Sequence, residues 1–378
     1  MENVLPPDSG VPSDPAPQLA SEAPVAIQPA TSMSATLSTS EAPVLRDRGT
    51  GLIVFGVFQV ILGLLAALMV PLVVLGAFMS RLSPTGSMRF GQFASGVATY
   101  GFISIVLLAL GIGSVQSKRW ARALTLVTSW YWLVTGTLVT ILLTAVLPVM
   151  MRSVLGQIKQ NSGNAPSAEM SAGIMAVFLT LIIVFMAFFL VLVPIAFVVF
   201  YGREDVAETC RRRDPVERWT DRTPLPLLGA SVVFFTGALY LLLTAVTLPM
   251  FPLFGHYLTG ISGSIALFGM AVIDSYLAIA FFRQHPSGWW IAAFVVPVRL
   301  ISVALTYAKA DMMKAYSRMG MSDAQLNVLN SNPMFRGHVL LWWGLISMLL
   351  FFGYIIWLKR YFKTPAHSQP EALSAQVV

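Results

Sequence analysis

The sequence predicts an all-α protein integral to a membrane, with about eight transmembrane helices arranged as two tandem four-helix repeats in the same orientation. Composition, the length of the apolar runs and a pattern shared by the two halves support this fold class. Of the 378 residues, 56% are hydrophobic and 11% are charged, against about 45–50% and about 25% in soluble domains. This composition excludes a soluble enzyme of ordinary make-up.

Eight stretches are long and apolar enough to cross the hydrocarbon core of a bilayer as helices, which takes about 20 residues. They cover approximately residues 51–79, 94–115, 121–148, 172–200, 226–253, 263–282, 289–308 and 338–358. An N-terminus inside the cell places 15 of the 24 lysines and arginines on cytoplasmic segments and 8 on outer loops. The positive-inside rule then predicts that both termini are cytoplasmic.

The segments between and around the spans complete the predicted organisation. We expect a disordered, acidic Pro/Ser/Ala-rich tail over 1–48, because such a composition buries too little apolar surface to fold. The remaining parts are a first membrane module at 49–200, a charged cytoplasmic linker at 201–225, a second membrane module at 226–362 and a short disordered tail at 363–378. A capping-box pattern at 322–325 predicts a short helix that ends before Pro333.

The two halves share a pattern of turns. A short basic turn leads into a helix that starts with Trp120, and another leads into one that starts with Trp289. Met-Met-Arg at 150–152 and Met-Met-Lys at 312–314 each open an outer loop. Because each half has four spans, an even number, the pattern predicts a parallel repeat about an axis along the membrane normal.

Two short runs carry a resemblance to known proteins. Gly-Ile-Gly-Ser at 111–114 precedes Lys-Arg-Trp-Ala-Arg at 118–122, and Arg-Trp-Thr-Asp-Arg-Thr-Pro occupies 218–224. The chain thereby resembles uncharacterised bacterial polytopic inner-membrane proteins over about its middle third. The resemblance implies the bacterial inner (cytoplasmic) membrane as the location, and it implies no activity.

Two charged residues fall inside predicted spans, where a charge is costly. Asp274 and Arg299 lie on either side of the short turn near Pro286, each about 18 Å from it at 1.5 Å per residue. Consecutive antiparallel helices can bring them together near mid-bilayer. We expect an ion pair that either fixes the register of the two helices or belongs to a gate or a proton or ion path.

Hydroxyl groups extend this candidate site. Arg299, Ser302 and Thr306 follow a helical spacing on one face, and Thr236 and Tyr240 begin a similar stripe on the fifth span. Two polar stripes in one half indicate a polar seam or a cavity. Serine and threonine also join membrane helices without lining a path, so the structural interpretation stays open.

The leading functional hypothesis is therefore a non-enzymatic membrane protein that transports or binds a small or lipidic solute through this seam. The alternative is a structural or accessory subunit of a membrane complex, with a protein partner or a second copy of the chain. A remote alternative is an intramembrane serine protease using Ser262 and His338. The single cysteine and four scattered histidines indicate no metal site, and no motif indicates a cofactor.

The excess of base gives a net charge of +7. In a membrane protein, such an excess is typical of topology signals and of contacts with anionic lipid headgroups. We therefore expect the lipid bilayer as a partner and no binding of nucleic acid.

Overall fold

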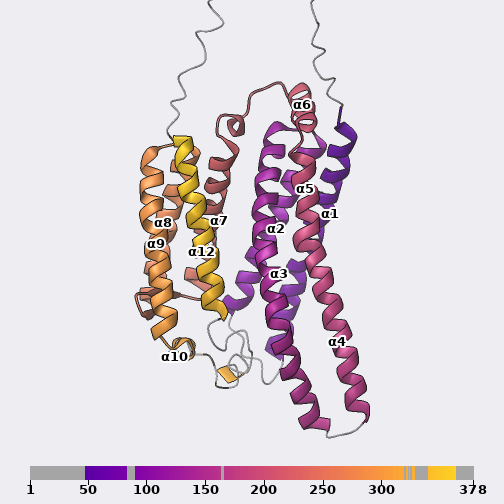
Figure 1. The fold of residues 1–378 in the computed structure, drawn as a ribbon, viewed down its shortest axis with the longest axis vertical. Helices are drawn as coiled ribbons and strands as arrows, with labels where there is room; N and C mark the ends of the chain where they lie inside the picture. The colour runs from indigo at the N-terminus through magenta and orange to yellow at the C-terminus, as the bar shows by residue number, and fades with distance from the viewer. Residues whose placement is uncertain are drawn as a thin grey trace, which may run out of the picture. The chain divides into compact units, whose positions relative to one another are not determined.

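A computed structural model describes residues 47–82, 90–162, 166–318, 321, 323, 326–327 and 339–362. Eight helices in this part of the chain are long and apolar enough to cross a membrane, which confirms the predicted number of spans. The chain is a multi-pass membrane protein whose apolar helices contact the lipid bilayer. Figure 1 shows the long helices running alongside one another.

In the first half, the residues that the structure describes beyond Gly49 form helices and the short connections between them. Its elements are α1 (Gly49–Leu82), α2 (Phe90–Val115), α3 (Arg119–Ser162), α4 (Pro166–Ala187), the π-helical turn η1 (Phe188–Leu192) and α5 (Val193–Tyr201). Helices α1 and α2 approach closely, because a Cβ atom on Gly56 would lie 2.9 Å from the carbonyl oxygen of Gly111. Small residues permit such close packing of membrane helices.

The fourth span, predicted as one uniform helix, contains the π-helical turn η1. Pro194 has no N–H group to donate to the carbonyl of Leu190, four residues earlier. The chain widens there, and the N–H of Val193 donates to the carbonyl of Phe188 instead. On α3, Gly136 faces the Leu190 carbonyl so closely that a Cβ atom would collide with it.

The segment predicted as a charged linker is folded. It forms helix α6 (Glu204–Arg213) and the 3-10 turn η2 (Trp219–Asp221). Helix α6 has Glu204 and Asp205 in its first turn and three arginines in its last turn. This order opposes the helix dipole at both ends and stabilises a short helix.

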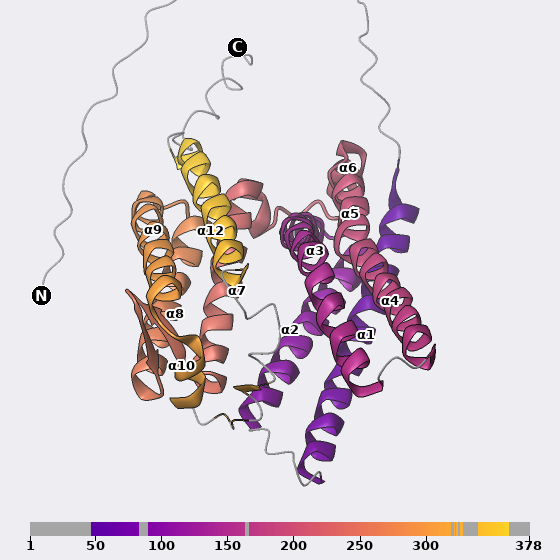
Figure 2. The same ribbon diagram turned by 60° about the horizontal axis from the view of Figure 1, so that its bottom comes forward.

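The second half combines helices with a β-hairpin. Its elements are α7 (Leu225–Thr247), β1 (Met250–Leu253), β2 (His256–Thr259), α8 (Ile261–Phe282), α9 (Pro286–Lys309), α10 (Met312–Arg318), α12 (Val339–Leu358) and the 3-10 turn η3 (Lys359–Phe362). Figure 2 shows the hairpin beside the lower ends of α8 and α9.

This hairpin corrects one prediction, because the fifth span ends at Thr247 and not at 253. It is a small addition to a fold that is otherwise helical, as predicted. Pro249 and Pro252 interrupt the helical bonding pattern, although the run is apolar throughout. The strands pair antiparallel from Met250 opposite Thr259 to Leu253 opposite His256. Both residues at the turn, Phe254 and Gly255, have positive φ (40° and 98°), as a two-residue hairpin turn requires.

The buried apolar side chains form one large cluster in each half and a small one between them. The cluster of the second half joins α7, α8, α9 and α12 around Phe234, Phe281 and Trp289. The cluster of the first half joins α1, α3, α5 and α6 around Phe197 and Tyr201. Ala123 and Val127 on α3 pack against Leu228 on α7 and connect the halves. The parallel repeat stays a prediction, and no described element of the first half corresponds to the hairpin.

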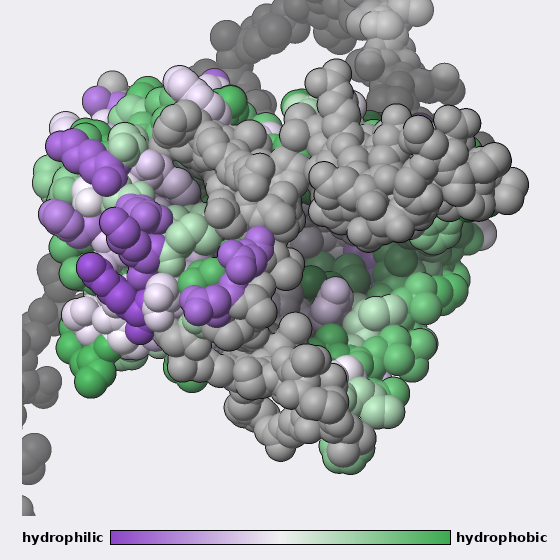
Figure 3. Space-filling view, turned by 90° about the horizontal axis from the view of Figure 1, so that it is seen from below, coloured by the Kyte–Doolittle hydropathy of each residue, from purple (hydrophilic) through white to green (hydrophobic). Residues whose placement is uncertain are grey.

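At the end of the second half opposite the linker, Lys314 on α10 lies 3.8 Å from Asp311. Figure 3 shows hydrophilic side chains gathered on this face. The short helix predicted after residue 322 lies mostly outside the described residues. Both predicted disordered tails lie outside them too, apart from residues 47–48.

Candidate functional site

The structure brings Asp274 on α8 and Arg299 on α9 together. The guanidinium group donates two hydrogen bonds to the carboxylate, with nitrogen–oxygen distances of 2.6 and 3.0 Å. The Asp274 side chain is 4% exposed and that of Arg299 is 23% exposed. This two-point geometry is the strongest form of an arginine–carboxylate contact.

The short turn between α8 and α9 sets the depth of this pair. Gly288 lies against the Cβ atom of Ala280, where a side chain would meet it at 2.7 Å. Gln284 in the turn adopts a positive φ of 58°, and the N–H of His285 donates to the carbonyl of Ala280. The two helices therefore leave the turn in close contact, and residues at similar distances along each helix face one another.

The third helix beside the pair is α7. A Cβ atom on Gly237 would lie 3.5 Å from Oδ2 of Asp274, which is ordinary contact. The Nε atom of Arg299 is buried and has no hydrogen-bond partner. A buried unpaired donor costs free energy, so this atom is the one polar group of the pair that packing leaves unsatisfied.

Ser302 and Thr306 hold the hairpin in place. The N–H of Phe254 donates to the hydroxyl of Ser302 (3.1 Å), and that of Gly255 donates to the hydroxyl of Thr306 (3.0 Å). The Ser302 hydroxyl donates in turn to the carbonyl of Pro252 (2.9 Å). Both side chains are buried. They satisfy the backbone groups of the strained turn, as buried backbone groups require.

The stripe predicted on α7 does not join them. The hydroxyl of Thr236 donates to the carbonyls of Val232 and Val233 on its own helix. The side chain of Tyr240 is 67% exposed. The residues of the predicted polar seam therefore fall into three groups. Asp274 and Arg299 form an ion pair, and Ser302 and Thr306 bond to the hairpin. The two hydroxyl residues of α7 form the third group.

The candidate protease dyad is described only in part. Ser262 is exposed, and its hydroxyl donates to the carbonyl of Thr259 (3.1 Å). His338 lies outside the described residues, so the dyad stays a prediction. Among the described residues, no group of three histidine, cysteine, aspartate or glutamate side chains is placed to hold a metal ion.

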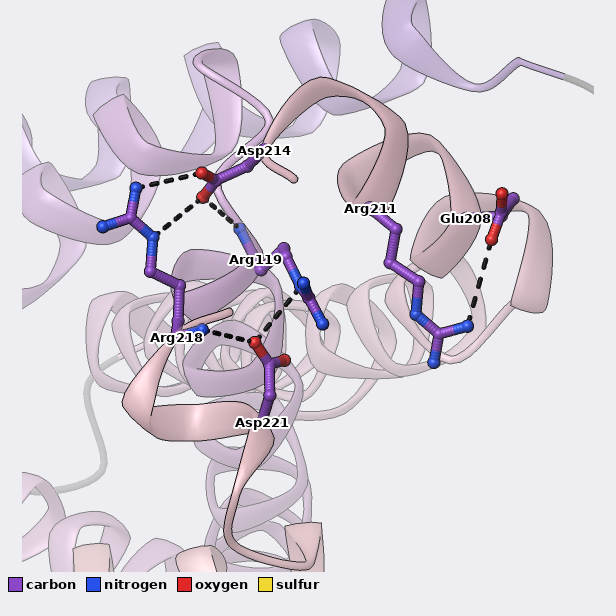
Figure 4. A network of polar contacts seen from close by, with 6 residues as sticks. All are labelled: Arg119, Glu208, Arg211, Asp214, Arg218 and Asp221. Carbon is purple, nitrogen blue, oxygen red and sulfur yellow. Dashed lines mark hydrogen bonds and ion pairs between the residues drawn. The ribbon is translucent and has the colours of Figure 1, made fainter. Parts of the chain in front are cut away.

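A polar network that the sequence did not predict joins the linker to α3. We call it the clasp, and it consists of Arg119, Asp214, Arg218 and Asp221 (Figure 4). Arg218 donates two side-chain hydrogen bonds to Asp214, at 2.9 and 3.2 Å. Arg119 at the start of α3 reaches Asp221 at 3.1 Å, and its backbone N–H donates to Asp214.

The linker also ties down other helix ends. Arg48, before α1, forms an ion pair of 3.5 Å with Asp205 on α6. Thr223 and Arg222 bond to the turn after α8, through the carbonyl of Phe282 and the side chain of Gln284. The start of α1, the end of α8 and the start of α3 are therefore all bonded to the linker.

The electrostatics of the clasp follow from these bonds. The hydrogen bonds from Arg218 hold the pKa of Asp214 below its usual value, and the carboxylate in turn raises the pKa of Arg218. Burial raises the pKa of the nearby Cys210 thiol to about 11. Asp214 and Arg218 are therefore both charged at neutral pH, while Cys210 is a neutral thiol.

One local signal in the sequence could have indicated the clasp. Asp214 and Arg218 stand four residues apart within a segment of mixed charge, a spacing typical of paired side chains. The third member, Arg119, is 95 residues from Asp214, and no local pattern links them.

No protein-family model, curated protein or solved structure matches this chain.

Proposed function

We propose that this chain is a non-enzymatic, structural or accessory component of a membrane complex, and not a conduit for solute along α8 and α9. The proposal rests on one observation, which is that the residues predicted to line a solute path are already bonded to other parts of the protein. Asp274 and Arg299 satisfy each other, and Ser302 and Thr306 are occupied by the hairpin. A solute path needs polar groups that are free to exchange partners.

The distribution of burial also supports a component of a larger assembly. Only 6% of the most apolar window of α1 is buried within the chain, against 39% for α8. The helices of the first half therefore present most of their apolar surface outward. That surface requires cover from lipid, from another membrane protein or from a second copy of this chain.

The proposal includes the bacterial inner membrane as the location, with both termini on the cytoplasmic side. Its support is the positive-inside rule together with the clasp. Arg119 and Arg218 belong to the clasp, and Arg48 binds the same linker. These bases therefore gather at one end of the helices, which is the end assigned to the cytoplasm.

A second candidate function, solute binding at the ion pair, is favoured by one observation. Arg299 Nε is buried without a partner, and Gly237 leaves the α7 side of the pair free of a side chain. A small anion or a water molecule placed there would satisfy this donor.

Engineered cysteines separate the two candidates. In a Cys210→Ala background, Thr236→Cys and Gly237→Cys place a thiol beside the predicted seam. Ser287→Cys, at the exposed turn between α8 and α9, is the matched control. In membranes opened to expose both faces, we expect a membrane-impermeant thiol reagent to label the control rapidly and the two seam positions at least about tenfold more slowly.

Native mass spectrometry of the chain, extracted in mild detergent from its own membranes, supplies the second readout. We expect a stoichiometric protein partner or a dimer. Rapid labelling of both seam positions, in a chain that carries a bound small molecule and no protein partner, would refute the accessory function and favour the second candidate.

A further inference from the structure

A cavity of about 230 Å³ lies beside the clasp, at the start of α3 and α7. Helix α6 and the turn η2 close its other sides. Its polar lining consists of Arg119, Arg122, Cys210, Arg211, Thr220, Asp221 and Thr223. Figure 4 shows Arg119, Arg211 and Asp221 on three different elements, with Arg119 joined to Asp221 and Arg211 joined to Glu208. We call this cavity the clasp pocket.

The charge of the clasp pocket is strongly positive. It contains three arginines and a single acid, Asp221. That acid is already occupied, because Arg119 contacts it at 3.1 Å and the N–H of Arg218 donates to it at 2.8 Å. Since Cys210 is a neutral thiol, Arg122 and Arg211 leave an excess of about two positive charges.

These two arginines lack strong partners within the chain. Arg122 has no ion pair among the described residues, and its Nε atom is buried without a hydrogen-bond acceptor. Arg211 lies 3.9 Å from Glu208, while the same carboxylate binds Arg212 more closely, at 3.1 Å. The pocket therefore holds cationic donors that the fold does not satisfy.

A neutral donor points to the same ligand chemistry. Thr220 lines the pocket and is only 2% exposed, yet its hydroxyl has no hydrogen-bond partner. Leaving a buried hydroxyl unpaired costs free energy, because the group has lost its bonds to water. A bound group with several acceptor oxygens would satisfy this hydroxyl and the Arg122 Nε atom together.

The surroundings strengthen the attraction for an anion. The remaining walls are apolar, from residues such as Ala123, Ala207 and Leu225, and an apolar wall strengthens electrostatic contacts by lowering the local dielectric constant. The pocket also faces the first turns of α3 and α7, where the helix dipoles contribute partial positive charge.

We propose that the clasp pocket binds a phosphate group, held by Arg122, Arg211 and Thr220. A phosphate group presents several acceptor oxygens to guanidinium donors, which match its geometry. The volume is below the roughly 300–1,000 Å³ of sites for drug-sized ligands, so it suits a headgroup-sized anion. Basic pockets between helices at the cytoplasmic surface are typical sites for anionic lipid headgroups, and a free phosphate ester has the same binding chemistry.

The test measures phosphate binding by the full-length chain in detergent micelles at constant ionic strength. The probes are inorganic phosphate, and phosphatidic acid mixed into the micelles, with phosphatidylcholine at the same mole fraction as the lipid control. Ligand-dependent thermal stabilisation gives the apparent Kd for each probe. The variants are Arg122→Gln, Arg211→Gln and Thr220→Val, and Arg283→Gln is the matched control for loss of one exposed positive charge.

We expect Arg122→Gln to weaken binding by about tenfold or more. The variant removes hydrogen bonds from a charged group to the phosphate, and the loss of such bonds lowers the affinity by about this factor. Thr220→Val leaves the charge intact and should weaken binding about two- to tenfold, so it tests the pocket even if Arg122→Gln fails to fold. Arg283→Gln should change the apparent Kd less than twofold. Tighter binding of phosphatidic acid than of inorganic phosphate identifies a lipid headgroup as the source, and equal binding identifies a soluble ester.

Two results would overturn the proposal. The first is the absence of any stabilisation by either phosphate probe beyond that given by phosphatidylcholine. The second is equal weakening by Arg283→Gln and Arg211→Gln with no effect of Thr220→Val, since that pattern describes general attraction to the basic surface.

Discussion

Breaking the Asp274–Arg299 ion pair should destabilise the protein, by an amount that depends on which partner is removed. Removing one partner of a buried ion pair typically costs about 3–5 kcal/mol, because the other charge is left uncompensated. The two side chains differ in exposure, at 4% for Asp274 and 23% for Arg299. Arg299→Gln leaves the more buried charge and should cost about 3–5 kcal/mol.

Asp274→Asn leaves a partly exposed guanidinium group on a long side chain, which can turn toward polar surroundings. We expect a smaller cost for this variant, about 1–3 kcal/mol. Exchanging the two charges should recover part of the loss, because the helices still present complementary groups at the same depth. The double variant with Asn and Gln should lose less than the sum of the single losses.

The assay is the unfolding of the purified chain in mild detergent, followed by tryptophan fluorescence. Ser275→Ala is the control, since Ser275 bonds only to the carbonyl of Ala271 on its own helix and should cost less than about 0.5 kcal/mol. The reasoning is refuted if both single variants unfold like the wild type, or if the double variant loses the full sum of the single losses.

Four further outcomes are expected. Thr306→Val should cost about 1–3 kcal/mol, because it leaves the N–H of Gly255 unpaired, and hydrogen exchange at that amide should accelerate. Gly136→Ala should cost about 1–3 kcal/mol by overpacking against the π turn, measured by thermal unfolding. Asp214 has a lowered pKa, so the stability gap between the wild type and Asp214→Asn should hold above about pH 4 and disappear as the pH falls through that pKa. Cys210, with a pKa raised to about 11, should react slowly with thiol reagents at pH 8 until the chain is unfolded.

Three of these outcomes have a specific contrary result. Gly76→Ala, at a helix position with open space around it, is the control for Gly136→Ala, and equal losses would remove the argument from packing. A stability gap that does not narrow at any pH below about 4 would show that Asp214 does not stabilise the clasp as a carboxylate. Rapid labelling of folded Cys210 would show that its burial does not suppress the thiolate.

The number of membrane spans was predictable because apolar length alone indicates a span. The approach of Asp274 and Arg299 followed from counting residues to a short turn, since helical rise is uniform. The hairpin was not predictable by the same reasoning. Its first strand, Met-Phe-Pro-Leu, is as apolar as a membrane helix, and Pro249 and Pro252 were the local signs that the helix stops earlier.

The sequence also did not predict that Ser302 and Thr306 bond to the hairpin turn. Their helical spacing was recognised correctly, but a hydroxyl group on one face bonds equally well to a solute, a helix or a hairpin turn. The clasp depends on contacts between residues far apart in the chain, such as Arg119 and Asp221. Such contacts arise from the packing of the helices, and no local pattern encodes them.

The arginines and acids that pair at the linker are synthesised at different times. Arg48 leaves the ribosome 157 residues before its partner Asp205, which corresponds to roughly 8–30 s at ordinary rates of translation. In the proposed orientation, Arg48 is an unpaired charge throughout that interval, and it would resist passage through the membrane and favour a cytoplasmic start of α1. When the acids of the linker emerge, the same arginine becomes one of its attachment points. Charges that act first as a topological signal thus become structural contacts in the finished protein.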